Sequence, residues 1–393
     1  MRGLAATRLR GRPAGLVPLA FGLVAAALLA GCRDDPASFS LPAPPEAPEG
    51  PLRLTLSPFH DAGPAWLPDG REVAYSAGRS DLFPDAVGAI VAVPAGGGQA
   101  RAVAQPYQET VAFPHFAAPA VSPNGDRIAI AELRITFPIF CGLGDTLDCG
   151  EFTPPTIPAP ELGLVALAVR SLDGSTSGPE HAITFDGARR LEGSLLVLES
   201  DPYQRAYSRS GLPFRPSWSP DGRRLVFADG AALYLWTPGD GDPVPVPGTT
   251  LAVAPAWSPD GATIAFTRLV GEPQQSFFCS CGEGKEEVFA DRRVSEVAEE
   301  HLELLDVASG AITDLGELGR DAAWSPSGDA LFVSRLGAIW RVPLANPAAA
   351  TPVPSTTRGR HPAVSPDGTL LAFTLIDAAG LGDVWVVPLE ATP

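Results

Sequence analysis

The sequence predicts an all-β fold, a six-bladed β-propeller, because one turn motif occurs six times and is followed each time by short apolar segments. The motif combines Trp or Val, Ser or Leu, Pro, a small polar residue and Gly, and it occupies 66–70, 121–125, 218–222, 257–261, 324–328 and 364–368. Pro followed by Asp, Asn or Ser and then Gly presets the backbone for a tight reversal. Each copy is therefore expected to join two strands.

The segments after the turns have the composition of strands. The first set is rich in β-branched and aromatic residues and covers 72–75, 127–130, 224–227, 263–266, 330–333 and 370–373. A third strand is expected at 89–93, 164–167, 233–236, 302–305, 338–341 and 383–386, and a weaker fourth strand completes most units. Repeats of about forty residues with four strands each are typical of propeller blades.

The turn motifs predict the number of blades, and the two ends of the propeller region predict how the ring is closed. Six motifs predict six blades, although the long gap between the second and third motifs leaves room for a degenerate seventh blade around 195–198. The sixth unit reaches Pro393 after its third strand, and propellers avoid an exposed sheet edge. We expect the alternating segment 52–56 to supply the missing strand of the last blade.

The Trp-Ser-Pro-Asp-Gly turn followed by Ile-Ala-Phe, at 257–266, resembles the WD-like β-propeller repeat of the TolB type. The resemblance covers 51–393 and implies a six-bladed propeller. It does not include the N-terminal α/β domain of TolB proteins, and those proteins are soluble in the periplasm.

The start of the chain has the pattern of a lipoprotein signal peptide. Four arginines precede an apolar run that ends in Leu29-Ala30-Gly31-Cys32, which predicts a secretory signal at 1–31 rather than a membrane span. The sequence Leu29-Ala30-Gly31-Cys32 resembles a bacterial lipobox, and this resemblance implies lipidation of Cys32. The alternative is an ordinary signal peptide in which the cysteine is incidental. Residues 32–50 are rich in Pro and Ala and are expected to form a tether. Arg33 after the cysteine favours sorting to the outer membrane.

Composition limits the range of partners. The net charge is −17, and a surface this acidic repels phosphate backbones, so nucleic acid is excluded as a partner. We expect a monomer that contacts the membrane through its lipid anchor and binds one or more envelope proteins.

Four further cysteines, Cys141, Cys149, Cys279 and Cys281, suit the same compartment. An even number in an exported protein favours disulfides, and their pairing stays open. A four-thiolate zinc site is the rival interpretation, but the spacings do not match its usual paired gaps.

Three long inserts are predicted at 134–161, 186–212 and 270–300. In an up-and-down blade they lie on one face and the turns lie on the other, and loops of this length are usually functional or disordered. Phe137, Phe140, Phe277 and Phe278 are the candidate contact residues of this face. The alternative is an ornament without a ligand.

Aligning the six units reveals a second candidate site, three residues before each turn motif, where the inner strand is expected to begin at the channel mouth. The ring reads Gly63, Ala118, Arg215, Ala254, Asp321 and His361, and Arg320 and Arg360 precede its last two members. This cationic cluster is a candidate binding site for a carboxylate, for instance of a uronic sugar. The alternative is that Asp321 pairs with a neighbouring Arg at the blade junction.

Metal and catalytic sites are not predicted. His60 and His115 occupy equivalent positions in blades one and two, but no third ligand recurs with them. The sequence has no Gly-x-Ser-x-Gly elbow, so a serine hydrolase is excluded, and no cofactor is expected. The sequence therefore predicts a non-enzymatic envelope lipoprotein that acts as a protein-binding scaffold through its insert face. The alternative is binding of, or lyase action on, acidic carbohydrate at the channel mouth.

Overall fold

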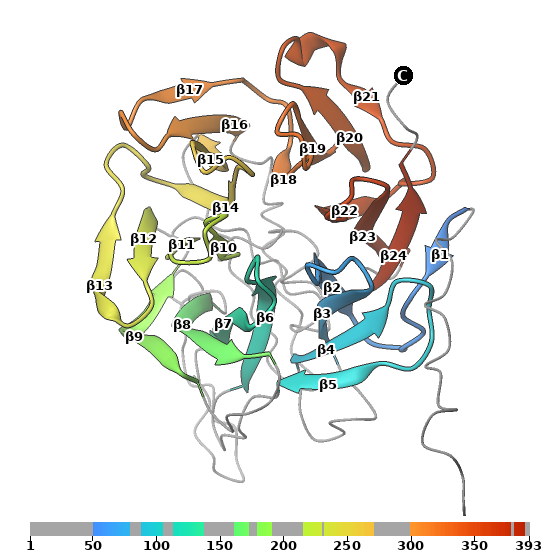
Figure 1. Cartoon of the computed structure of the whole chain (residues 1–393), viewed down its shortest axis with the longest axis horizontal. Helices are drawn as coiled ribbons and strands as arrows, with labels where there is room; N and C mark the ends of the chain where they lie inside the picture. Colours follow the sequence, from blue (N-terminus) through green and yellow to red (C-terminus); the bar gives the residue numbers. More distant parts are fainter. Residues whose placement is uncertain are drawn as a thin grey trace, which may run out of the picture. The chain divides into compact units, whose positions relative to one another are not determined.

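The computed structural model describes residues 50–78, 88–104, 113–136, 161–172, 179–190, 215–229, 232–270, 299–378 and 381–389. All of them belong to one compact unit, Pro45–Pro393. They form six four-stranded antiparallel sheets arranged as a propeller around a central channel (Figure 1). The predicted fold class is confirmed. The predicted signal peptide and the tether up to residue 49, including Cys32, lie outside the described residues.

The first three blades are consecutive in sequence. Their strands, from the innermost outward, are β2 (Asp61–Trp66), β3 (Glu72–Ala77), β4 (Ala89–Pro94) and β5 (Arg101–Ala104); β6 (Phe113–Val121), β7 (Arg127–Thr136), β8 (Glu161–Ser171) and β9 (His181–Arg190); and β10 (Ser217–Trp218), β11 (Leu225–Ala228), β12 (Leu233–Thr237) and β13 (Asp240–Pro245).

The other three blades follow the same order, except that the last one takes its outer strand from the start of the described chain. They contain β14 (Ala252–Trp257), β15 (Thr263–Val270), β16 (Glu299–Asp306) and β17 (Ile312–Asp314); β18 (Arg320–Trp324), β19 (Ala330–Arg335), β20 (Ala338–Pro343) and β21 (Thr351–Pro352); and β22 (Gly359–Val364), β23 (Leu370–Ile376), β24 (Gly382–Pro388) and β1 (Leu52–Arg53). A short 3-10 turn, Pro347–Ala349, precedes β21.

The hydrophobic core is divided into six clusters, one at each junction between neighbouring blades. Leu167 and Phe227 belong to the cluster between blades two and three, and Val73 and Val384 belong to the one between blades one and six. Burying one such side chain contributes roughly 1.5–3 kcal/mol. Because blades two and three share a core directly, the alternative of a seventh blade between them is wrong.

Serine hydroxyl groups hold the turns. The Oγ atoms of five turn serines each accept a hydrogen bond from the backbone N–H five residues later, at 2.9–3.1 Å; they are Ser122, Ser219, Ser258, Ser325 and Ser365. In the turns with Asp221, Asp260 and Asp367 the same hydroxyl also donates to the Asp, and this bond is the main cause that lowers the pKa of that carboxyl below its usual range. Each turn is thus closed by side chains as well as by its backbone.

The turn motifs contact one another around the ring. The φ of the six turn glycines lies between 66° and 75°, a conformation that favours glycine. A Cβ built on each would lie 3.5–3.9 Å from the turn proline of the preceding blade, which pairs Pro366 with Gly70, Pro68 with Gly125, Pro123 with Gly222, Pro220 with Gly261, Pro259 with Gly328 and Pro326 with Gly368. The six turns therefore form a closed circle on one face of the disk, which we call the turn face.

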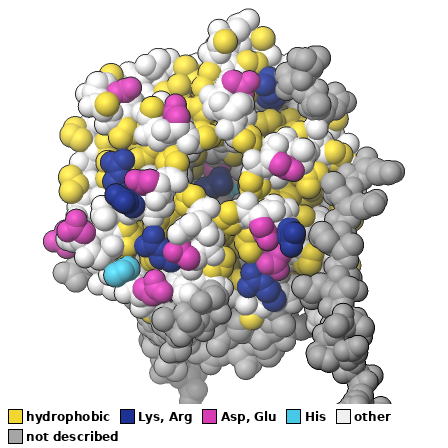
Figure 2. All heavy atoms as spheres, viewed as in Figure 1, with side chains coloured by type: hydrophobic (Ala, Val, Ile, Leu, Met, Phe, Trp, Pro, Cys, Tyr) yellow, Lys and Arg dark blue, Asp and Glu magenta, His cyan; other side chains and the backbone are white. Residues whose placement is uncertain are grey.

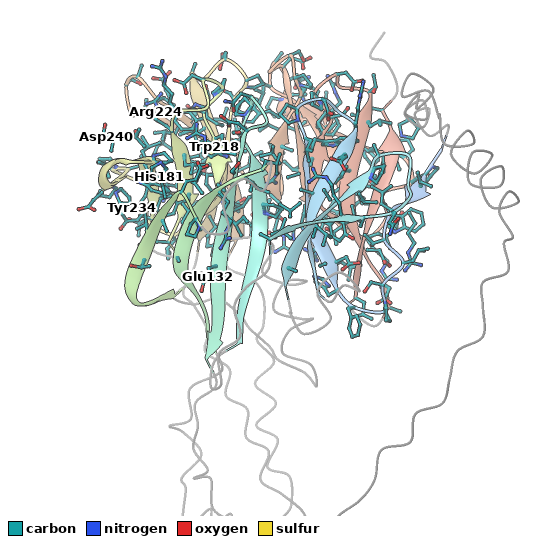
Figure 3. The ribbon with its side chains drawn as sticks, turned by 60° about the horizontal axis from the view of Figure 1, so that its bottom comes forward. Glu132, His181, Trp218, Arg224, Tyr234 and Asp240 are labelled. Carbon is teal, nitrogen blue, oxygen red and sulfur yellow. The ribbon has the colours of Figure 1, made fainter. Side chains whose placement is uncertain are left out.

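Three turn tryptophans bridge neighbouring blades. The indole N–H groups of Trp66, Trp218 and Trp324 donate to a backbone carbonyl of the preceding blade, each at 2.9 Å; the acceptors are Ala363, Ala120 and Ala256. Trp257 differs, because its indole N–H donates to Gly261 within its own turn. Figure 3 shows Trp218 and Arg224 near the turn face, with Glu132 of β7 further toward the opposite face.

Backbone pairing joins the start of the described chain to the last blade. β1 is antiparallel to β24 in the register Leu52↔Val386 and Arg53↔Trp385. The N–H of Leu54 then donates to the carbonyl of Val384 at 2.8 Å.

Beyond Leu54, side chains take over the pairing of β24. The Oγ1 of Thr55 accepts from the N–H of Val384 at 3.0 Å, and the Nδ1 of His60 accepts from the N–H of Gly382 at 2.9 Å. An ion pair between Arg53 and Asp383, at 2.8 Å, lies beside them. We call residues 52–60 the closing segment. They form hydrogen bonds with backbone groups at the edge of β24, which would otherwise be open to pairing with another chain.

Candidate functional site in the central channel

The inner strand of five blades contains a β-bulge at the ring position that the sequence singled out. The bulged residue has a φ between 49° and 68°, and these residues are Gly63, Ala118, Ala254, Asp321 and His361. For a residue other than glycine this conformation costs roughly 1–2 kcal/mol. The ring therefore lies at a bend inside the inner strands, not at their beginning as the sequence suggested.

Proline follows the bulged residue in four of these five blades, and Ala322 follows it in blade five. A bulge leaves one residue without its ladder partner, and proline has no N–H to leave unpaired. The position after the ring residue therefore lacks a backbone donor in these four blades.

Arg215 is the sixth member of the ring and belongs to blade three. Its Nη1 lies 3.5 Å from the carbonyl oxygen of Pro362 in blade six, on the opposite side of the ring (Figure 1). The side chain thus crosses the channel. Figure 2 shows basic atoms, in dark blue, at the floor of a hollow in the centre of the disk. Burial lowers the pKa of Arg215 and the nearby Asp321 raises it; the guanidinium stays charged because arginine titrates far above neutral pH.

Asp321 and His361 are buried beside Arg320. The side chains of Asp321 and His361 are 3% and 1% exposed, and the distance between Asp321 Oδ2 and His361 Nε2 is 3.9 Å. Arg320 Nε is also 3.9 Å from Asp321 Oδ2, but Arg320 Nη1 lies only 2.8 Å from Glu300 Oε1. The charge of Arg320 is therefore compensated by Glu300, a partner that the repeat alignment could not reveal.

His361 is held by the neighbouring strand. Its Nδ1 lies 3.2 Å from the Oγ1 of Thr374, which also accepts a hydrogen bond from the N–H of Gly63 at 3.1 Å. Burial, assisted by the charges of His60, Arg320 and Arg215, lowers the pKa of His361 well below its usual value. The imidazole of His361 is therefore neutral at pH 7. The carboxylate beside Nε2 favours the tautomer with the proton on Nε2.

Arg360, the remaining member of the predicted cluster, is the second residue of β22 and lies opposite Thr374 in the register of β22 and β23. It is half-buried.

A second buried polar group, which the sequence did not predict, lies in and beside the closing segment. Asp61 is 1% exposed, accepts a hydrogen bond from the N–H of Gly78 at 3.2 Å, and burial raises its pKa to about 7. Burial lowers the pKa of His60 to about 4. His60 accepts a hydrogen bond from Gly382 and so helps to close the propeller; the sequence had raised a metal pair with His115 as an alternative. The side chain of His115 lies outside the described residues. Within the described ranges no group of three or more His, Cys, Asp or Glu side chains is arranged to hold a metal ion.

The predicted contact and disulfide residues of the inserts lie outside the described residues: Phe137, Phe140, Phe277, Phe278, Cys141, Cys149, Cys279 and Cys281. The strands that flank the inserts are described. Thr136 pairs with Glu161 and Gly163 with Arg190 in blade two, and Val270 pairs with Glu299 in blade four. These strand ends are opposite the turns, and we call their side of the disk the insert face.

The fold and the site define the class of protein: a six-bladed β-propeller with a charged central channel. Among solved structures, it is similar to TolB from Acinetobacter baumannii, with 14% identity and a TM-score of 0.40 over 86% of this chain and 56% of that protein. A putative TolB from Agrobacterium tumefaciens matches with 16% identity and a TM-score of 0.39, over 75% and 95% of the two chains. At this similarity neither match carries an argument about function.

No protein-family model matches the sequence, and no curated protein sequence matches it significantly. In the part of the chain that the structure describes, no helix combines the length and the apolar character of a membrane span.

Proposed function

We propose that the protein is an exported envelope lipoprotein, anchored at the outer membrane through Cys32, that acts as a scaffold and binds a partner protein on its insert face. The propeller provides a rigid disk, and the tether gives the disk reach from the membrane. The protein acts by binding and not by catalysis.

The observation that carries this proposal is the position of the insert flanks. The ends of β7, β8, β9, β15 and β16 that border the three long inserts all lie at the blade ends opposite the closed circle of turns. These described strand ends belong to blades two and four, which are separated in the ring by blade three alone. Loops that are positioned by a rigid scaffold are the usual location of binding residues.

The experiment compares two variants of the full-length protein in its native envelope. One lacks residues 138–158 of the blade-two insert, and the other carries Arg215→Met, Arg360→Met and His361→Asn in the channel. We expect the first variant to lose the partner that co-purifies with the wild type, whereas the channel variant keeps it. Retention by the deletion variant together with loss by the channel variant would refute the scaffold proposal.

A further inference from the structure

We propose that the central channel binds a small monocarboxylate, with Arg215 as the clamp and His361 as a second donor. This proposal concerns the channel and does not depend on the scaffold function of the insert face.

Arg215 and His361 have more hydrogen-bond donors than the described residues beside them accept. A guanidinium carries five N–H donors in a planar fork. Within the described part of the chain, Arg215 uses one of them in a long bond of 3.5 Å to Pro362. The Nε2 of His361 is buried and has no hydrogen-bond partner among the described residues. Two donor groups that face one channel require acceptors, and a carboxylate supplies two oxygens in the geometry that a guanidinium fork binds.

The lining of the channel is also suited to an acceptor ligand. The prolines after four of the bulges contribute a carbonyl but no N–H beside the ring, so a ligand there meets backbone carbonyls together with the side chains of Arg215 and His361. The hollow seen in Figure 2 leads from the disk surface to basic atoms at its floor. The hollow is therefore open to a small or narrow acid from solvent.

Asp321 limits the charge of the ligand. Its carboxylate lies 3.9 Å from both His361 Nε2 and Arg320 Nε, so it already places one negative charge in the channel. Glu300 compensates Arg320, and Arg215 is the cation whose side chain crosses the channel. A second negative group on the ligand would be repelled, and the site therefore selects a monocarboxylate over phosphate or a dicarboxylate.

The test is a titration of the full-length protein with its histidine rings labelled with nitrogen-15. The probes are sodium acetate and sodium D-glucuronate, with sodium chloride, sodium phosphate and glucose as controls, all at matched ionic strength. We expect a saturable shift of the His361 Nε2 signal with both carboxylates, at a dissociation constant of about 1 mM, the affinity expected for so few ligand atoms. Tighter binding of glucuronate than of acetate would identify an acidic sugar as the source of the carboxylate, and equal binding would identify free small acids.

Three variants make the test specific. Arg215→Met is expected to weaken carboxylate binding at least about tenfold, because the charge-assisted bond is lost. Asp321→Asn is expected to tighten it several-fold, because a negative charge is removed and Asn tolerates the positive φ of this position. Arg341→Met is the matched control: Arg341 pairs with Asp329 at a distance from the channel, and no change is expected.

The proposal is overturned if chloride shifts the signal as much as acetate does, or if acetate and glucuronate give no saturable shift. It is also overturned if Asp321→Asn leaves the affinity unchanged, because Asp321 would then serve only the blade junction. The wild-type titration and Asp321→Asn decide the matter even if Arg215→Met fails to fold.

Discussion

Replacing Thr55 by Val tests how the propeller is closed. The hydroxyl of Thr55 is buried at the end of the closing segment, where it accepts from the N–H of Val384 and lies 3.2 Å from the carboxylate of Asp383. Valine has nearly the same shape but no hydroxyl. The substitution therefore removes the two hydrogen bonds that Thr55 makes with β24, while it preserves the packing and the bonds of Leu54 and His60.

The expected loss follows from the groups left unpaired. The N–H of Val384 is fully buried, and leaving one such donor unsatisfied costs about 1–3 kcal/mol. Asp383 keeps Arg53 as a partner, so it adds less. We expect a total loss of about 3 kcal/mol. With an unfolding entropy of roughly 2.1 cal/mol/K per residue, this corresponds to a decrease of about 4 °C in the melting temperature of a unit of this size.

The assay combines thermal unfolding with amide hydrogen exchange, and Thr356→Val is the matched control. Thr356 is equally buried, and its hydroxyl accepts from Ile339 and donates to Val353 within blade five. Both variants should be less stable, but only Thr55→Val should accelerate the exchange of the Val384 amide beyond the change in global stability. Equal protection of Val384 in the two variants would refute the idea that the closing segment protects the edge of β24.

Three further predictions concern single residues. The pKa of Asp61 is about 7 in the folded protein against an ordinary 3.8, so the folded state prefers the protonated form and stability falls as the pH rises from about 4 to 7; in urea titrations Asp61→Asn should be more stable than the wild type by on the order of 2–4 kcal/mol at pH 8 and by far less at pH 4. A stability difference that does not change with pH would contradict the buried carboxyl. Gly368→Ala should cost about 1–2 kcal/mol in the same assay, because φ is 75° there and an L side chain is strained in this conformation; no loss would argue against the left-handed conformation at the end of this turn. Cys32→Ser should move the protein from the membrane to the soluble fraction after cell lysis, and continued membrane association would contradict the lipid anchor.

The repeat made the fold predictable. The Pro and Gly of each turn and the apolar segments after it are local signals, and they locate the inner three strands of every blade. The aligned position before each turn also identified the channel residues Asp321 and His361, because the six inner strands are equivalent.

The contacts between ring members were not predictable in the same way. Arg215 reaches Pro362 only because blades three and six are opposite each other, and Arg320 binds Glu300 because β16 of blade four lies close to β18 of blade five. His60 appeared as a repeat of His115, but closure places it against Gly382. Such contacts depend on distances in space between residues that are remote in the sequence, which a repeat alignment does not contain.

The central claim, that the insert face binds a partner protein, is tested most directly through the single lysine of the chain. Lys285 lies within the predicted insert 270–300, so an amine-reactive crosslinker applied to the intact envelope probes that insert selectively. The control carries Lys285→Arg and Arg223→Lys, which moves the single lysine to the turn of blade three. We predict a reproducible crosslink to one envelope protein through Lys285 and none through the lysine on the turn face. The same crosslink from both positions, or from the turn face alone, would contradict the account.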